Sequence, residues 1–181
     1  MRKNIGSVLA LYPTPVTVVG ADVDGKPNWL LVAHVGIMGH DHIMISCAKP
    51  HYTNKGIKEK GIVSVNMVDE SILEKTDYVG SVSGNKKDKS KVFDVERGEL
   101  DSPMISDSPL TMECVVVDNY ETKGFDNFIL KIKNTYIKEE LLNERNKPDY
   151  DKFKPVLFEM PSYRYLRTGD VMGNCMHIGK E

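Results

Sequence analysis

The chain has 181 residues, of which 40% are hydrophobic and 28% are charged, and its formal net charge is −2. These values are typical of one globular domain with a sound core, and they argue against extended nucleic-acid binding, which needs a basic surface. No apolar run is long enough to cross a bilayer, and the N-terminus lacks the pattern of a signal peptide. Three scattered cysteines are too few for a disulfide framework, so we expect a single domain over residues 1–181 in a reducing cytoplasm.

Most of the predicted elements are strands, and six are expected, at residues 15–21, 27–35, 42–48, 62–67, 110–120 and 127–137. An Asp24-Gly25 pair predicts a hairpin turn after the first of them. A helix of about two turns separates the third strand from the fourth, and a second helix follows Ser71. This order predicts a mainly β protein with inserted helices, folded as a closed or nearly closed antiparallel barrel that leaves few open strand edges.

The loop after the third strand predicts an anion site. Lys49, His51, Thr53 and Asn54 lie where the short helix should begin. Backbone N–H groups at a helix start are unpaired and carry partial positive charge, and these side chains add donors and a cation. The alternative is an ordinary strand–helix connection with polar capping.

A second anion-binding element is predicted between residues 71 and 93. The apolar side of the expected helix (Ile72, Leu73, Tyr78 and Val79) runs into Gly80, Ser81, Ser83 and Gly84, and then into Lys86, Lys87, Lys89 and Lys91. Glycines let backbone approach a ligand closely, and lysines supply positive charge beside it. A short lysine run by itself is usually solvated surface, but two such elements in one small domain favour a phosphorylated ligand.

The ordered set of motifs resembles the flavin reductase-like, FMN-binding split-barrel family, and within it the flavoredoxin-type proteins. The motifs are PTPVTVVGA at 13–21, ISCAKPHYTNKGI at 45–57, VNM at 65–67 and TDYVGSVSGNKKDKSKVF at 76–93. The resemblance runs from Lys3 to Tyr163. It implies a split β-barrel that forms a homodimer and holds FMN in a surface groove.

The resemblance also implies a set of cofactor-binding residues. Asn28 and the Ala33-His34-Val35 stretch would line the flavin ring, while Ser46, Cys47, Ala48 and Lys49 would follow its polar edge and ribityl chain. Thr53 and Asn54 would hold the chain or phosphate, and Lys89 would pair with the phosphate. Tyr78 and the loop with Ser81, Ser83 and Gly84 would close the pocket.

Two positions depart from the family pattern. Flavoredoxin-type relatives often have tryptophan where this chain has His34, which replaces a stacking surface by a smaller, titratable ring. The family's glycine-arginine-aspartate loop reads Gly84-Asn85-Lys86-Lys87-Asp88 here. His34 is either a proton donor to reduced flavin or a polar residue at the pocket rim.

Other chemistry is weakly indicated. His40, Asp41 and His42, with Cys175 and His177, do not match a standard zinc spacing, so no metal site is expected. Cys47 is expected to be a small buried apolar residue rather than a redox partner of the flavin.

The first hypothesis is an FMN-dependent oxidoreductase of the flavin reductase type, fed by a reduced donor such as NADH or NADPH. The cofactor carries the chemistry, so no catalytic side chain is required. The second is a flavoredoxin-like electron carrier that receives electrons from a redox protein partner and does not turn over nicotinamide. A third is an unrelated use of the barrel, for pyridoxal phosphate, haem or coenzyme handling, and the two phosphate elements disfavour haem.

Overall fold

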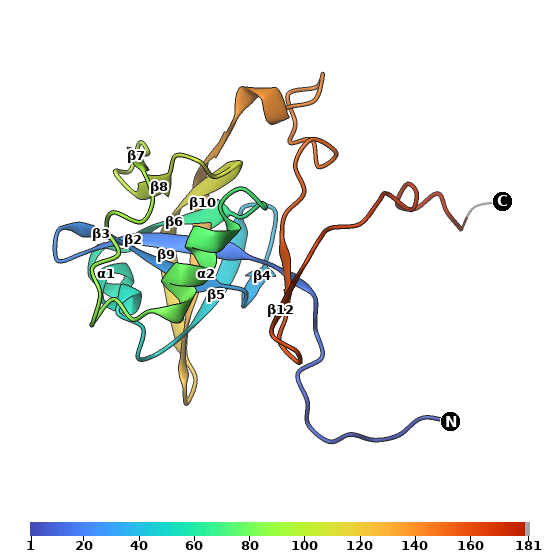
Figure 1. Ribbon diagram of the computed structural model, residues 1–181, viewed down its shortest axis with the longest axis horizontal. Coiled ribbons are helices and arrows are strands. Elements are labelled where there is room, and N and C mark those ends of the chain that lie inside the picture. Colours follow the sequence, from blue (N-terminus) through green and yellow to red (C-terminus); the bar gives the residue numbers. More distant parts are fainter. Residues whose placement is uncertain (180–181) are drawn as a thin grey trace.

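Seven strands form one curled, fully antiparallel sheet with the order β3-β2-β6-β9-β10-β5-β4 (Figure 1). The computed structural model describes residues 1–179. The elements are β1 (Thr14–Pro15), β2 (Thr17–Val23), β3 (Lys26–Val32), β4 (Val35–Ile37), β5 (His42–Ala48), α1 (Thr53–Lys60), β6 (Ile62–Met67), α2 (Leu73–Ser81), β7 (Val95–Arg97), β8 (Pro103–Ile105), β9 (Leu110–Glu121), β10 (Phe125–Ile137), the 3-10 helix η1 (Glu139–Leu141), β11 (Leu157–Glu159) and β12 (Arg164–Leu166). The described helices include none with the length and apolarity needed to cross a membrane.

The barrel is split where one extended segment changes partners. Residues of β3 pair with β2, whereas β4 pairs with β5, and Ala33 and His34 lie between them. The last hydrogen bond between this segment and β5 runs from the Ser46 N–H to the His34 carbonyl at 2.9 Å. The first and last strands of the sheet are therefore continuous in the chain, and the sheet curls on itself. The prediction of a single strand over 27–35 was wrong at this point, because the segment has to leave β2 to reach β5.

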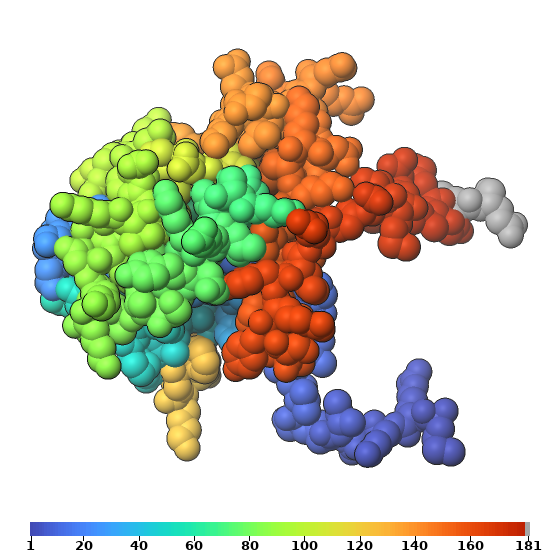
Figure 2. Space-filling view, in the orientation of Figure 1, coloured from blue at the N-terminus to red at the C-terminus, as the bar shows by residue number. Residues whose placement is uncertain are grey.

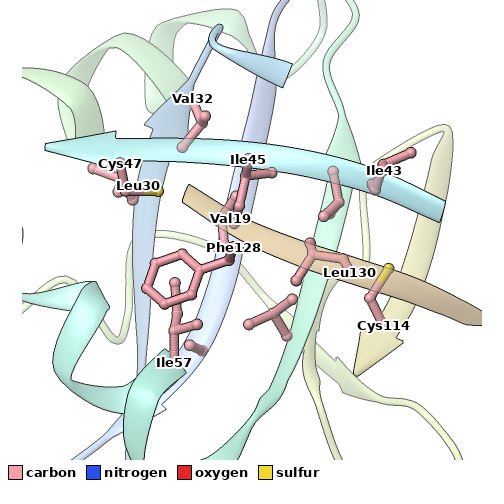
Figure 3. Close-up of a cluster of buried hydrophobic side chains, with 13 residues drawn as sticks. Val19, Leu30, Val32, Ile43, Ile45, Cys47, Ile57, Cys114, Phe128 and Leu130 are labelled. Carbon is pink, nitrogen blue, oxygen red and sulfur yellow. The ribbon is translucent and has the colours of Figure 1, made fainter. Parts of the chain in front are cut away.

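Side chains on β2 and β3 alternate between two apolar clusters, so both faces of these strands are buried. One cluster fills the barrel interior and includes Val19 and Leu30, which Figure 3 shows together with Phe128 and Ile57. The other lies outside the barrel and is centred on Trp29. The predicted β-branched run therefore forms a central strand, as its composition indicates.

The outer cluster is covered by α2 and by a small sheet of β1, β11 and β12. Val79 on α2 is fully buried there, whereas its neighbour Tyr78 is 44% exposed. The prediction that Tyr78 shares the apolar side of this helix was therefore wrong. Helix α1 packs against β2 and α2 packs against β3 (Figure 1).

Two terminal segments extend away from this body. Residues 1–11 and 169–179 are exposed and run outward on the same side of the molecule (Figures 1 and 2). Both carry large apolar side chains in the open, namely Ile5, Val8, Leu9, Leu11, Val171, Met172, Met176 and Ile178.

Candidate functional site

An apolar cavity of about 380 Å³ opens at the split of the barrel. Its walls come from β3 and β5 on either side of the split, from Gly80, and from aromatic residues at 125, 158 and 163. The lining residues are Leu30, Leu31, Val32, Ala33, His34, Ser46, Cys47, Ala48, His51, Gly80, Phe125, Phe158, Met160 and Tyr163. Five of the residues that the resemblance assigns to the flavin therefore lie together here, namely Ala33, His34, Ser46, Cys47 and Ala48.

A polar cavity of about 340 Å³ lies at the other end of β3. Its lining residues are Val23, Asp24, Lys26, Pro27, Asn28, Tyr52, Gly84, Asn85, Lys86, Lys87, Asp88 and Lys89. Asn28, Gly84 and Lys89 are the predicted site residues among them. The two cavities share three walls, which are β3, the loop that leads into α1, and the segment 80–89. They form an apolar end and a polar end along the same strand.

Glycine allows the segment 80–89 to approach β3 closely. A Cβ atom on Gly84 would come within 2.7 Å of both Asn28 Oδ1 and Tyr52 Cδ1, and one on Gly80 would come within 3.0 Å of Leu31 Cβ. Any larger residue at position 84 would displace the loop or the asparagine beneath it. The close approach observed at these glycines is to β3 and Tyr52, whereas the sequence predicted close approach to a ligand.

Polar side chains at the start of α1 are buried and ordered by hydrogen bonds. Asn28 Nδ2 donates to Thr53 Oγ1 at 2.6 Å, and Asn54 Nδ2 donates to the Ala48 carbonyl at 3.1 Å and to Asp126 at 2.9 Å. Within the described residues, the buried Asn54 Oδ1 has no hydrogen-bond partner. A buried acceptor of this kind usually marks a place where a ligand or water supplies the missing donor.

Lys89 is buried, with only 3% of its surface exposed. Its ammonium donates to the carbonyls of Val79 at 3.1 Å and Val82 at 3.4 Å, at the end of α2. These carbonyls lack partners within the helix, so the lysine caps α2. In the part of the chain that the structure describes, no carboxylate pairs with it, and burial lowers the pKa of Lys89 to about 8. Burial and the charge of Lys89 also lower the pKa of His51, which is therefore neutral at pH 7.

The backbone of Ala48 faces the apolar cavity. N–H groups on a strand alternate in direction, so the Ala48 N–H points to the same side as the Ser46 N–H, which bonds His34. Strand β4 pairs with residues 43–45 of β5, and its pairing ends at Ile45. No strand continues β4 along β5 as far as Ala48. The Ala48 carbonyl on this side accepts bonds from the His51 N–H and from Asn54. The cavity therefore presents a backbone donor at the split.

Lys49, Val35, Tyr78, Ser81 and Ser83 lie around these cavities rather than in their lining. Lys49 is exposed and pairs with Glu121 at 2.6 Å. Val35 packs on the apolar cluster inside the barrel, and Tyr78, Ser81 and Ser83 are exposed.

The Cys47 side chain belongs to the apolar cluster inside the barrel (Figure 3), and desolvation, with a contribution from Asp126, raises the pKa of its thiol to about 12. Cys47 is therefore a thiol and not a thiolate at neutral pH.

Sequence reasoning missed the aromatic wall of the apolar cavity. Phe158, Met160 and Tyr163 come from the β11–β12 hairpin, and Phe125 begins β10. The signal that could have found it is the aromatic content of the C-terminal region, at Phe158, Tyr163 and Tyr165. Of the residues whose spacing did not predict a zinc site, Asp41 and His42 pair with each other at 2.6 Å.

Comparison with known proteins finds the same architecture. Residues 9–167 match the family model described as a flavin reductase like domain. Flavoredoxin from Methanosarcina acetivorans is 38% identical, with a TM-score of 0.94 over 99% of this chain and 98% of its own. Flavoredoxin of Desulfovibrio vulgaris (Miyazaki F) is 30% identical, with a TM-score of 0.91 over 99% of this chain and 100% of its own. A curated, uncharacterized protein of Aeropyrum pernix is 26% identical over 162 residues, and this chain spans 57% of its length.

Proposed function

The chain belongs to the flavin reductase-like domain family, and from that premise we propose that it binds FMN non-covalently and passes electrons through it to an acceptor. The observation that carries this proposal is the paired cavities along β3, one apolar and one polar. FMN has an apolar ring system at one end and a phosphate at the other, so the two ends of the groove match the two ends of the cofactor. Cavities of a few hundred cubic ångströms are typical of cofactor sites.

The apolar cavity suits the flavin ring. Phe125, Phe158 and Tyr163 supply aromatic surface, and the Ala48 N–H faces the space between β3 and β5. FMN supplies the hydride chemistry when it is bound. A backbone donor that is fixed by the barrel stabilises negative charge on a ligand at this edge, at no cost in reorganisation.

The polar cavity and the neighbouring start of α1 suit the ribityl phosphate. Lys89 is a buried cation without a carboxylate partner among residues 1–179, and the Thr53 hydroxyl accepts a bond from Asn28 and keeps its own hydrogen for a ligand. The orphaned Asn54 Oδ1 is free to accept from a hydroxyl. Lys49 has its charge neutralised by Glu121 and contributes less. We therefore assign the phosphate to Lys89 and Thr53.

The electron donor distinguishes two versions of this function. NADH or NADPH would make the protein a flavin reductase, whereas a redox protein would make it a carrier of the kind that the two flavoredoxin relatives represent by name. We favour the reductase, because the apolar cavity is open to solvent along Tyr163, which is 74% exposed. The cytoplasm suits either version, since all three cysteines are free thiols.

An anaerobic titration tests the proposal. We expect saturable perturbation of the FMN absorbance bands on adding protein, followed by rapid bleaching when NADH or NADPH is added. Bleaching that requires a reduced protein donor would favour the carrier instead. Failure of FMN to bind would contradict both versions.

We also propose that the protein is a homodimer whose terminal segments cross to the partner copy. Residues 1–11 and 169–179 expose apolar side chains that the body of the monomer does not cover. Contiguous exposed apolar surface usually marks an association site. Light scattering should give the mass of a dimer for the wild type and of a monomer for the double variant Leu9→Asp/Leu11→Asp. The double variant Arg2→Asp/Lys3→Asp is the control on the same segment and should stay dimeric.

A further inference from the structure

Three segments that are far apart in the chain meet beside the apolar cavity. Tyr12 precedes β1, His34 lies at the split between β3 and β4, and Met160 follows β11. The Tyr12 hydroxyl lies 3.0 Å from His34 Nε2 and 3.4 Å from Met160 Sδ. His34 and Met160 line the cavity, whereas Tyr12 is not among the lining residues.

This arrangement accommodates the His34 imidazole in both of its protonation states. When the ring is neutral with its hydrogen on Nδ1, the Tyr12 hydroxyl donates to Nε2. When the ring is protonated, Nε2–H donates to the Tyr12 oxygen, and the hydroxyl hydrogen turns to the Met160 sulfur, which only accepts. A proton gained at Nε2 therefore has an acceptor in the Tyr12 oxygen, and the Tyr12 hydroxyl keeps an acceptor in the Met160 sulfur.

Few charged or titratable groups surround the His34 side chain. Of the neighbouring elements, β5 presents the Ser46 N–H, which bonds the His34 carbonyl, and β10 presents the Phe125 ring at 6.0 Å. The titratable group that contacts it is Tyr12, from the N-terminal segment, and the titratable groups elsewhere in the lining are Tyr163, from the β11–β12 hairpin, His51 and Cys47. Among the described lining residues there is no carboxylate and no lysine or arginine. New negative charge in the cavity would therefore be the strongest local influence on His34.

We propose that His34, positioned by Tyr12, takes up a proton when the ligand in the apolar cavity is reduced, and releases it on reoxidation. This inference rests on the proposed binding of FMN. A hydride adds two electrons and one proton to the oxidised ring and leaves it with one negative charge. His34 binds one further proton from solvent, so the cavity remains neutral overall. The acceptor later removes the electrons, and the His34 proton returns to solvent or leaves with the product.

Histidine NMR tests this directly and without turnover. The protein labelled with nitrogen-15 in histidine is loaded with FMN and titrated from acidic to basic pH, once oxidised and once reduced with dithionite. His34 is assigned by the loss of its signals in His34→Gln, and His42, which pairs with the exposed Asp41, serves as the internal control. We expect the titration midpoint of His34 to rise by about one pH unit or more on reduction, a tenfold change in proton affinity, while that of His42 stays fixed.

A second variant separates positioning from a merely structural role. Tyr12→Phe keeps the ring but removes the hydroxyl that accepts the bond from Nε2–H, so the rise on reduction should shrink while FMN still binds. A His34 midpoint that is equal in the oxidised and reduced forms, with FMN bound, overturns this inference and leaves the proposed function intact. Failure of FMN to bind overturns both.

Discussion

Replacement of Lys89 by alanine is expected to weaken FMN binding by about tenfold or more, because a charge-assisted hydrogen bond contributes roughly 1.5–3 kcal/mol. The buried ammonium would be lost together with its bonds to the carbonyls of Val79 and Val82. Fluorescence titration of FMN measures the affinity, and thermal unfolding without FMN measures the separate cost to the end of α2. The two readouts distinguish phosphate binding from helix capping.

Lys86→Ala is the matched control, since Lys86 belongs to the same loop and the same cavity but is exposed. An exposed charge contact contributes about 0–1 kcal/mol, so the affinity should change by less than about fivefold. Equal FMN affinities for Lys89→Ala and the wild type would remove Lys89 from the site.

The same residue should give the proposed FMN binding a dependence on pH. Because burial lowers the pKa of Lys89 to about 8, the folded protein without FMN loses this charge above that pH, whereas the unfolded chain keeps it until its usual range near 10.5. The contribution of Lys89 to stability without FMN therefore rises between these two values, while FMN affinity falls as the pH rises through about 8. Lys89→Arg, which stays charged, should abolish this fall.

Replacement of Glu113 by alanine is expected to lower the free energy of unfolding by about 3 kcal/mol or more, because it would strand several buried donors. The carboxylate is fully buried and accepts bonds from the Leu100 N–H at 2.9 Å, from Ser102 Oγ at 2.9 Å, from Asn134 at 2.9 Å and from Tyr136 at 3.3 Å. Chemical denaturation measures the loss. Glu99→Ala, on the exposed part of the same loop, should change stability by less than about 0.5 kcal/mol.

Glu113 also predicts a loss of stability in acid. Burial raises the pKa of Glu113, but hydrogen bonds from Asn134 and Ser102 outweigh it and hold the pKa below its usual value of 4.5. The contribution of Glu113 to the free energy of unfolding is therefore fully present above pH 4.5, and it is lost as the pH falls through the lowered pKa of the folded state. A wild type and a Glu113→Ala protein of equal stability at pH 7 would contradict this account.

The sequence predicted the barrel well because its strands carry local signals. Five of the six expected strands have counterparts in β2, β5, β6, β9 and β10, and the sixth is divided at Ala33 and His34. The division follows from pairing with two different strands, and pairing between distant segments has no local signature. The same reason explains Glu113, which lies within a predicted strand and which the loop 97–102 buries.

The candidate site was predictable where its residues are close in sequence. The loop from Ser46 to Thr53 brings its polar groups together by itself, and so does the segment that ends at Lys89. The resemblance indicated Lys89 as a cation near a phosphate, but its burial under the end of α2 depends on tertiary packing. Tyr12 and Met160 reach His34 from opposite ends of the chain, so no spacing in the sequence predicts their contact.

The division between β3 and β4 would make binding of the proposed cofactor part of the folding energetics. A closed barrel satisfies its backbone groups strand by strand, whereas this one leaves the edge at Ala48 facing a cavity. A flavin in that gap would take the place of the missing stretch of ladder. Stability would then grow with the logarithm of the free flavin concentration above its dissociation constant. In cells, the amount of folded protein would follow the supply of FMN, so that a shortage of the cofactor would expose the chain to degradation first at this seam.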